Sequence, residues 1–240
     1  MKTEFLFTGD TSGQVCVWQK LENNYNVIYK QQTGEPIKFL AYFSPKNFLF
    51  VVTNTKILVW DFEKDEVITS FETTNLAITN FLVVNNSIWI SSGKEIFVYS
   101  ITKMINKTEN RSAKELGSVI VRNIREHDSK VVSLASIKDF SVNFVFSASQ
   151  KGSVFVHDTS LFSILKRFSL PDTVVFFMTP VYFDSKVWCF SESHCITQFF
   201  VKKEEEQKRY QAYFQIKPSE IENSSKKKTP SELEKIFMWK

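Results

Sequence analysis

The feature that most constrains this fold is an internal repeat of about forty residues. Five hairpin-like units recur, at residues 5–19, 48–61, 87–100, 144–158 and 186–200. The second strand of each unit ends at a ring-bearing side chain, and these are Trp18, Trp60, Tyr99, His157 and Phe199. Three of the four intervals between them agree within three residues, and the fourth is longer by about 16. A fixed period of this length indicates a repeat architecture, with one loop insertion in the long interval.

Further apolar runs lie on both sides of each hairpin and complete its strand pattern. Upstream runs occupy residues 37–43, 77–84, 131–137 and 174–182, and downstream runs occupy 27–29, 67–71, 119–124, 164–168 and 210–216. Four strands in a unit of this length is the period of a β-propeller blade. We therefore expect an all-β propeller of about five four-stranded blades, with units at about 1–34, 35–74, 75–126, 127–172 and 173–216. An irregular β-sandwich is the alternative.

Two units carry motifs that resemble a known family. The stretches 56–61 (Lys-Ile-Leu-Val-Trp-Asp) and 13–18 (Gly-Gln-Val-Cys-Val-Trp) are similar to the strand-ending Trp-Asp of WD-repeat propellers. The pair Glu126-His127 is similar to the Gly-His that opens a repeat. This resemblance covers about residues 3–200 and implies structural roles for His127 and the five ring positions. The family's buried Asp, in the turn before the last motif strand, has no match in any unit, so its His–Asp–Ser–Trp network is incomplete and apolar packing is expected to hold the units together.

The first unit is expected to lack its innermost strand, because only residues 1–4 precede Phe5. Three interpretations stay open. The ring is closed by the C-terminal segment, or it is part of a larger propeller completed by more chain or by a partner, or one blade is too degenerate to recognise. An open ring leaves sheet edges that can pair with other strands.

The C-terminal region changes character after residue 216. Residues 217–230 are polar and predict a linker, and 231–240 predict a short amphipathic helix. Ser231 and Glu234 form a capping box, and Leu233, Ile236 and Phe237 share one helical face. This helix either packs on the propeller or joins another domain. The long interval places a surface loop at residues 100–117, between two strands of one blade.

Composition and motifs argue against several classes of protein. Apolar runs are too short for a membrane span, and 30 basic against 26 acidic residues give a net charge of only +4. The six glycines form neither a phosphate-binding loop nor a dinucleotide fingerprint, and there is no Gly-x-Ser-x-Gly elbow. Cys189, His194 and Cys195 are the one metal-like group, but zinc generally needs a fourth ligand, so buried apolar cysteines are favoured. We therefore predict no catalytic centre, metal or cofactor.

The sequence thus favours a non-enzymatic scaffold for protein–protein interaction, within a signalling or regulatory assembly. The alternatives are an RNA-associated propeller in ribosome or mRNA processing, and the targeting domain of a larger enzyme. Lysines recur in the turns between second and third strands, where the candidate partner-binding residues are Lys56, Lys94 and Lys151, with Lys130 in a blade-opening loop. The expected partners are acidic or phosphorylated protein segments rather than nucleic acid. Three cysteines and no secretory signal pattern predict a cytoplasmic location, with the nucleus as the alternative.

Overall fold

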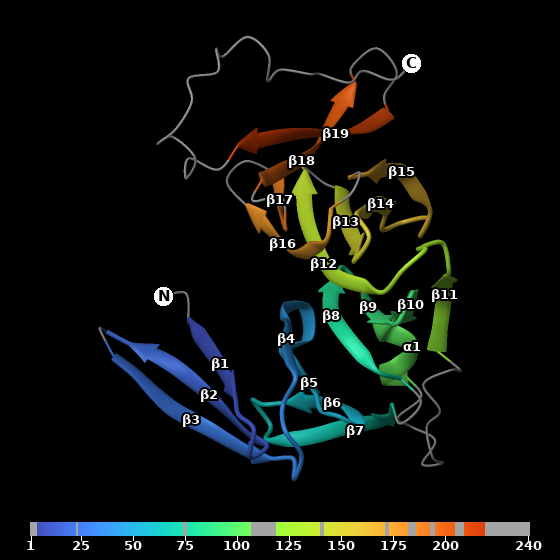
Figure 1. The fold of residues 1–240 in the computed structure, drawn as a ribbon. Coiled ribbons are helices and arrows are strands. Elements are labelled where there is room, and N and C mark those ends of the chain that lie inside the picture. The colour runs from blue at the N-terminus through green and yellow to red at the C-terminus, as the bar shows by residue number, and fades with distance from the viewer. Residues whose placement is uncertain are drawn as a thin grey trace. The chain divides into compact units, whose positions relative to one another are not determined.

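The protein is described by a computed structural model for residues 4–22, 24–73, 76–106, 119–139, 142–170, 173–181, 186–192, 195–204 and 209–218. The chain divides into two compact units, Met1–Val131 and Val132–Lys240. Each unit is built from antiparallel sheets in which consecutive strands pair (Figure 1). The all-β class predicted from the sequence is confirmed.

The first unit contains three sheets, numbered here in chain order. The first sheet has three strands, β1 (Phe5–Gly9), β2 (Gln14–Leu21) and β3 (Asn24–Gln32). The second has β4 (Phe39–Phe43), β5 (Phe48–Val52), β6 (Lys56–Asp61) and β7 (Glu66–Glu72), with a 3-10 turn at Ser44–Lys46. The third has β8 (Ile78–Val84), β9 (Ser87–Ser92), β10 (Glu95–Ser100) and β11 (Ile120–Ile124).

The second unit contains two four-stranded sheets. The fourth sheet has β12 (Val131–Asp139), β13 (Val142–Ser149), β14 (Ser153–Asp158) and β15 (Ile164–Ser169). The fifth has β16 (Val175–Val181), β17 (Lys186–Ser191), β18 (Cys195–Glu204) and β19 (Arg209–Pro218). Because β19 extends to Pro218, the linker predicted to begin at residue 217 starts too early. The remainder of that linker and the predicted helix at 231–240 lie outside the described residues.

The ring positions fix the correspondence between the sheets. Trp60, Tyr99, His157 and Phe199 each lie in the third strand of a four-stranded sheet, whereas Trp18 lies in β2, the middle strand of three. In this alignment β1 corresponds to a second strand. The described part of the first sheet therefore has no counterpart of β4, β8, β12 or β16.

Two sheets use the ring position for the same diagonal hydrogen bond. Trp18 Nε1 donates to Thr8 Oγ1 over 2.8 Å, and His157 Nε2 lies 2.7 Å from Ser147 Oγ. In both cases the hydroxyl residue lies two positions beyond the residue directly opposite the ring. The other three sheets hold a non-hydroxyl residue at that position, and these residues are Val51, Ile90 and Cys189. The rings in these three sheets instead lie in apolar clusters of the described residues.

A second recurring bond sets the position of the turns between second and third strands. In four sheets a carbonyl oxygen of this turn accepts a main-chain N–H from the segment that leads out of the sheet. The pairs are Thr33 N to Gly13 O at 2.9 Å, Thr73 N to Thr55 O at 2.6 Å, Val131 N to Gly93 O at 2.8 Å, and Leu170 N to Gly152 O at 2.9 Å. Each such turn therefore lies beside the connection to the following sheet.

Gly152 is required at its turn by both conformation and space. Its φ is +86°, and a Cβ there would lie 2.3 Å from the carbonyl oxygen of Leu170. We expect Gly152→Ala to lower the free energy of unfolding by roughly 2–3 kcal/mol, because the strain adds to the clash. Gly34 is the matched control, since its φ is +78° but a Cβ would meet nothing within 4 Å. Urea unfolding of both variants measures the difference, and equal losses would contradict the role of the Leu170 contact.

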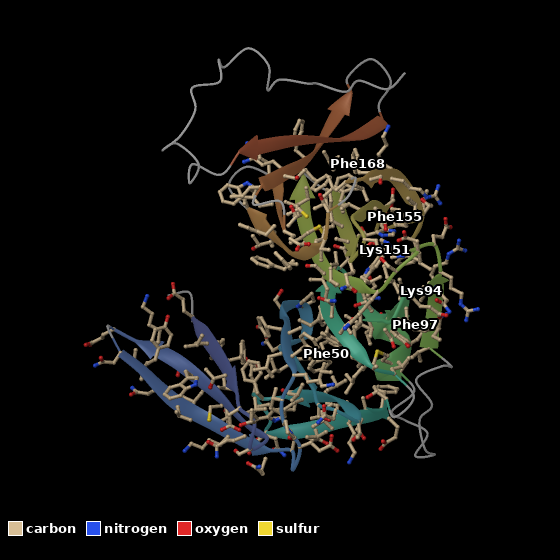
Figure 2. The ribbon with its side chains drawn as sticks, viewed as in Figure 1. Phe50, Lys94, Phe97, Lys151, Phe155 and Phe168 are labelled. Atoms are coloured by element: carbon tan, nitrogen blue, oxygen red, sulfur yellow. The ribbon has the colours of Figure 1, made fainter. Side chains whose placement is uncertain are left out.

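Inward-facing residues of the described strands form apolar cores: the first unit has one among its second and third sheets and another between its first and second sheets, and the second unit has its own. In the first unit Phe50 is fully buried among the strands of the second and third sheets. In the second unit Phe168, labelled in Figure 2, packs on Phe199 with ring centroids 5.3 Å apart. Phe146 lies 6.2 Å from the Phe199 ring. Many of the phenylalanine side chains therefore lie in these cores.

A short helix, α1 (Ile101–Asn106), occupies the start of the segment predicted as a surface loop. Ile101 and Met104 are fully buried and join the core of the first unit. The expectation of a loop is therefore wrong for these six residues. Deleting the predicted loop from residue 103 onwards would remove Met104, a core side chain. Residues three apart share one face of a helix, but a single turn is too short to give a detectable period. Residues 107–118 lie outside the described ranges.

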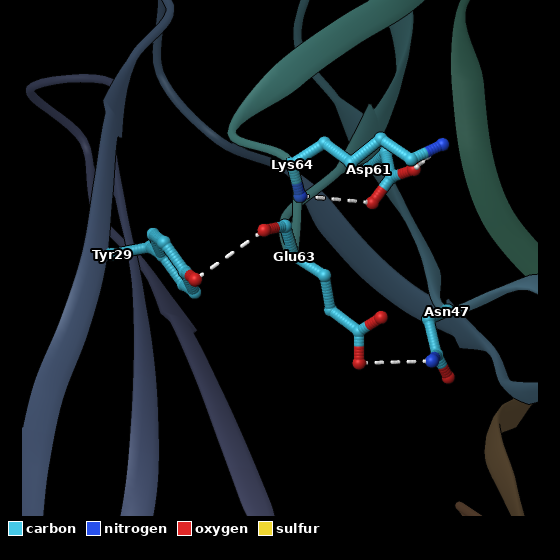
Figure 3. Close-up of polar contacts among 5 residues, drawn as sticks. All are labelled: Tyr29, Asn47, Asp61, Glu63 and Lys64. Carbon is cyan, nitrogen blue, oxygen red and sulfur yellow. Dashed lines mark hydrogen bonds and ion pairs between the residues drawn. The ribbon is translucent and has the colours of Figure 1, made fainter.

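Polar contacts at the β6–β7 turn join the first and second sheets (Figure 3). Tyr29 of β3 donates its hydroxyl to the Glu63 carbonyl over 3.4 Å, and Asn47 Nδ2 donates to Glu63 Oε1 over 2.9 Å. Asp61, next to the buried Trp60, accepts the Lys64 main-chain N–H at 3.2 Å and pairs with its ammonium at 3.2 Å. The carboxylate of Asp61 therefore stabilises the β6–β7 turn, which carries Glu63 and its contacts with Tyr29 and Asn47.

Candidate interaction site on the third sheet

A hollow of about 570 Å³ lies at one end of the third sheet. Its walls come from the β9–β10 turn, the start of β10, the residue Leu76 before β8, and the connection from β11 to β12. The lining residues are Leu76, Ser92, Gly93, Lys94, Glu95, Phe97, Arg125 and His127. The volume lies within the range of small-ligand and peptide side-chain pockets. These segments meet here because Val131 N–H bonds to the Gly93 carbonyl and draws the β11–β12 connection against the turn.

Lys94 stands at the tip of the β9–β10 turn, at the mouth of the hollow (Figure 2). Gly93 before it has φ +58°, the left-handed conformation that tight hairpin turns require. Lys94 is exposed and forms no ion pair with a described residue. Phe97 and Leu76 are partly buried and supply the apolar part of the lining. The site thus combines a free cation with apolar surface.

Arg125 provides a second cation, and Glu95 orients it. Arg125 Nε lies 3.2 Å from Glu95 Oε2, and the same oxygen accepts a bond from Asn123 Nδ2 at 3.0 Å. The Arg125 side chain is largely exposed, and the described residues provide no partner for its two Nη groups. These groups are therefore available to a carboxylate or phosphate, which guanidinium groups bind in bidentate fashion.

His127 forms the inner wall of the hollow. Its side chain is only 4% exposed, and burial lowers its pKa to about 4, although the neighbouring Asp128 acts in the opposite direction. The imidazole is therefore neutral at physiological pH and adds no charge to the site. Its burial agrees with the structural role that the WD-repeat resemblance implies for this position.

The four candidate lysines are divided between different surroundings. Lys94 lines the hollow, and the exposed Lys130 directly precedes Val131, whose N–H is bonded to the hollow's turn. Lys56 is half-buried at the start of β6 and stabilises the carboxylate of Glu35. Lys151 is exposed in the β13–β14 turn of the second unit. The structure therefore places Lys94 and Lys130 on neighbouring segments, joined by the bond between Val131 and Gly93, and places Lys56 and Lys151 elsewhere.

Glu35 binds the β5–β6 turn that carries Lys56. Its carboxylate accepts bonds from the hydroxyls of Thr53 and Thr55 and from the Thr55 main-chain N–H. These bonds, first that of the Thr55 hydroxyl, lower the pKa of Glu35 below its usual value, and Lys56 contributes in the same direction. The bonds from Thr53 and Thr55 to Glu35 therefore hold this turn in place.

Four of the five ring positions are buried, as expected for structural residues. Trp60, His157 and Phe199 are fully buried and Tyr99 is nearly so. Burial also raises the pKa of Tyr99 well above its usual value, so its hydroxyl stays protonated. Trp18, expected to be buried like Trp60, is only partly covered.

The metal-like group of the sequence has one described side chain. Cys189 is buried in the second core, and burial raises the pKa of its thiol to about 12, so it packs as a small apolar group. His194 and the side chain of Cys195 lie outside what the structure describes. Among the described residues no group of three or more His, Cys, Asp or Glu side chains is arranged to hold a metal ion.

No helix in the same ranges has the length and hydropathy to cross a membrane.

Of the eight lining residues, sequence reasoning singled out only Lys94 and His127, and it missed Leu76, Phe97 and Arg125 among the others. Arg125 lies two positions before His127, so the blade-opening segment itself was the signal that could have identified it. Leu76 and Phe97 read as ordinary core positions, because their half-exposure depends on which segments pack beside them. In the second unit, the exposed Phe176 and Phe177 of β16 were likewise not singled out, and Phe177 stacks on Phe190 at 4.6 Å.

Comparison with models of protein families gives no match, and a search of the curated proteins gives none either. The function is therefore argued from the geometry of the hollow and of the repeated sheets.

Proposed function

We propose that this protein is a non-enzymatic interaction scaffold of the β-propeller type, with WD-like repeats, and that the hollow on the third sheet binds acidic segments of partner proteins. The five antiparallel sheets, the recurring ring position and the recurring turn bond support the propeller. The observation that carries the function is the pairing of two available cations, Lys94 and Arg125, with apolar surface in one hollow.

The chemistry of the hollow suits recognition of an anionic side chain beside an apolar one. Lys94 offers an exposed ammonium, and Glu95 pairs with Arg125 through Nε, which leaves the Nη groups for a ligand. Phe97 and Leu76 then contact apolar neighbours of the acidic residue. Lys130 adds a nearby positive charge that increases the attraction at longer range.

Ser92, Glu95 and His127 in the hollow include the residue types of an acyl-transfer triad. The recorded bonds of Glu95 go to Asn123 and Arg125 rather than to an imidazole. A histidine whose pKa is about 4 is also a weak base at physiological pH. These features support recognition rather than catalysis at this site.

The proposal is tested with labelled peptides that carry a phosphoserine or a glutamate next to a leucine or phenylalanine, using fluorescence polarisation on the full chain. We expect Lys94→Glu to weaken binding of these peptides by roughly tenfold or more, since a charge-assisted contact is replaced by repulsion. Lys30→Glu is the matched control, because Lys30 is an exposed lysine of β3 that does not line the hollow.

Binding should also weaken between 50 and 300 mM salt, as expected for partly exposed charges. The proposal fails if the folded Lys94→Glu variant keeps the affinity of the unaltered chain. Retention of RNA that is lost with Lys94→Glu would favour the RNA-associated alternative instead.

A further inference from the structure

Among the residues that the structure describes, none pairs with the inner edge of the first sheet. Lys20 N–H bonds to the Glu4 carbonyl at 3.0 Å, and Asp10 N–H bonds to the Gln14 carbonyl at 3.1 Å. Because bonding alternates along an antiparallel pair, residues 6 and 8 face β2, whereas the main-chain groups of Phe5, Phe7 and Gly9 face away from it. Within the described ranges no segment hydrogen-bonds to those three residues. The edge thus presents three N–H and three C=O groups to an added strand.

The side chains of β1 determine which side chains an added strand must place beside them. Phe5 and Phe7 pack against Phe62 of the second sheet, with ring centroids 5.3 and 5.4 Å apart. Leu6 is on the opposite face and is 47% exposed. An added strand therefore needs apolar side chains opposite residues 5, 7 and 9.

The second sheet of the same chain shows what such a strand looks like. Leu49 lies opposite Trp60 as Leu6 lies opposite Trp18, so β5 corresponds to β1, and β4 is its inner partner. By this correspondence the strand Lys38-Phe-Leu-Ala-Tyr-Phe43 would place Phe43, Ala41 and Phe39 opposite Phe5, Phe7 and Gly9. Lys38 would then lie opposite Asp10.

The charges at the two ends of β1 favour some added strands over others. Glu4 and Asp10 flank the strand, and Glu4 is 59% exposed although it pairs with Lys20. Bonds from the Ser12 side chain and the Gln14 main chain lower the pKa of Asp10, so its carboxylate is ionised. A second copy of β1 added antiparallel would set Glu4 against Asp10 at both ends, and like charges directly opposite are destabilising. A strand with basic ends is favoured instead.

We propose that the open edge of β1 binds an extended segment of a partner protein by antiparallel strand addition, and that this segment has apolar residues at alternate positions and a basic residue at each end. Main-chain bonds to Phe5, Phe7 and Gly9 give the affinity, and the aromatic face and the two acidic ends select the sequence. This surface is separate from the hollow on the third sheet, so the proposal can be tested independently of the function proposed above.

The test uses the full chain and the capped peptide Lys-Phe-Leu-Ala-Tyr-Phe-Lys, followed by amide hydrogen exchange resolved by residue. We expect the peptide to slow exchange at Phe5, Phe7 and Gly9 by tenfold or more. Leu6 and Thr8 are internal controls, because their amides already bond to β2 and should change little. A peptide N-methylated at its alanine should not bind, since that N–H faces Phe7, whereas N-methylation at its leucine removes an outward N–H and should be tolerated.

Four results would overturn the proposal. Protection of Phe5, Phe7 and Gly9 in the free monomer would mean that another segment of this chain covers the edge, and protection that rises with protein concentration would mean a second copy does. Equal binding of Glu-Phe-Leu-Ala-Tyr-Phe-Glu would remove the role of Glu4 and Asp10. Unchanged exchange with saturating Lys-Phe-Leu-Ala-Tyr-Phe-Lys would show that the edge accepts no such strand.

Discussion

Replacing Trp60 by alanine is expected to lower the free energy of unfolding by roughly 3–5 kcal/mol, because it empties a fully buried site in the core between the first and second sheets. The ring packs among Leu49, Val51 and Phe62, and meets Phe62 nearly edge-on at 6.4 Å. Its Nε1–H is buried without a partner among the described residues. Trp60→Phe should therefore cost much less, since it keeps most of the ring and removes an unsatisfied donor.

Trp18→Ala is the matched control for the same position in the repeat. Trp18 is partly covered and its indole bonds to Thr8, so we expect a loss of about 1–2 kcal/mol. Chemical unfolding followed by far-ultraviolet circular dichroism measures all three variants. If Trp60→Ala and Trp18→Ala cost the same, the assignment of Trp60 to a packed core position is wrong.

Acidification is expected to destabilise the fold through His127 before most carboxylates titrate. Burial lowers the His127 pKa to about 4 in the folded chain, against 6.5 for an exposed histidine. The unfolded chain therefore binds the proton more tightly, and the stability due to neutral His127, complete above pH 6.5, is lost as the pH falls towards 4. The difference corresponds to roughly 3 kcal/mol.

His127→Gln isolates this contribution, because it removes the titrating ring and leaves the other groups unchanged. Asp128 opposes the shift, and Lys94, Glu95 and Arg125 line the same hollow, so their charges are kept constant in both chains. Subtracting the two curves of unfolding free energy against pH should give a slope confined to pH 4–6.5. A flat difference would show that the ring is solvated in the folded protein.

The sequence by itself determined the strand-rich class and the place of each sheet along the chain. Alternating apolar residues and turn residues act locally, so runs such as 48–52 and 56–61 identify strands without knowledge of their neighbours. The ring positions were found for the same reason, since the repeat period is a property of the chain alone. The short helix at Ile101–Asn106 escaped because one turn carries too little periodic signal.

Only the tertiary structure decided which surface residues act together. Lys56 begins β6, beside a turn that Glu35 binds, whereas Lys94 lies in the β9–β10 turn and lines a hollow. Arg125 enters that hollow because a main-chain bond from Val131 to Gly93 draws its segment against the turn. Contacts between segments far apart in the chain depend on packing and not on local pattern. For that reason the sequence could place a lysine at three of the five turns but could not say which of them lines a hollow.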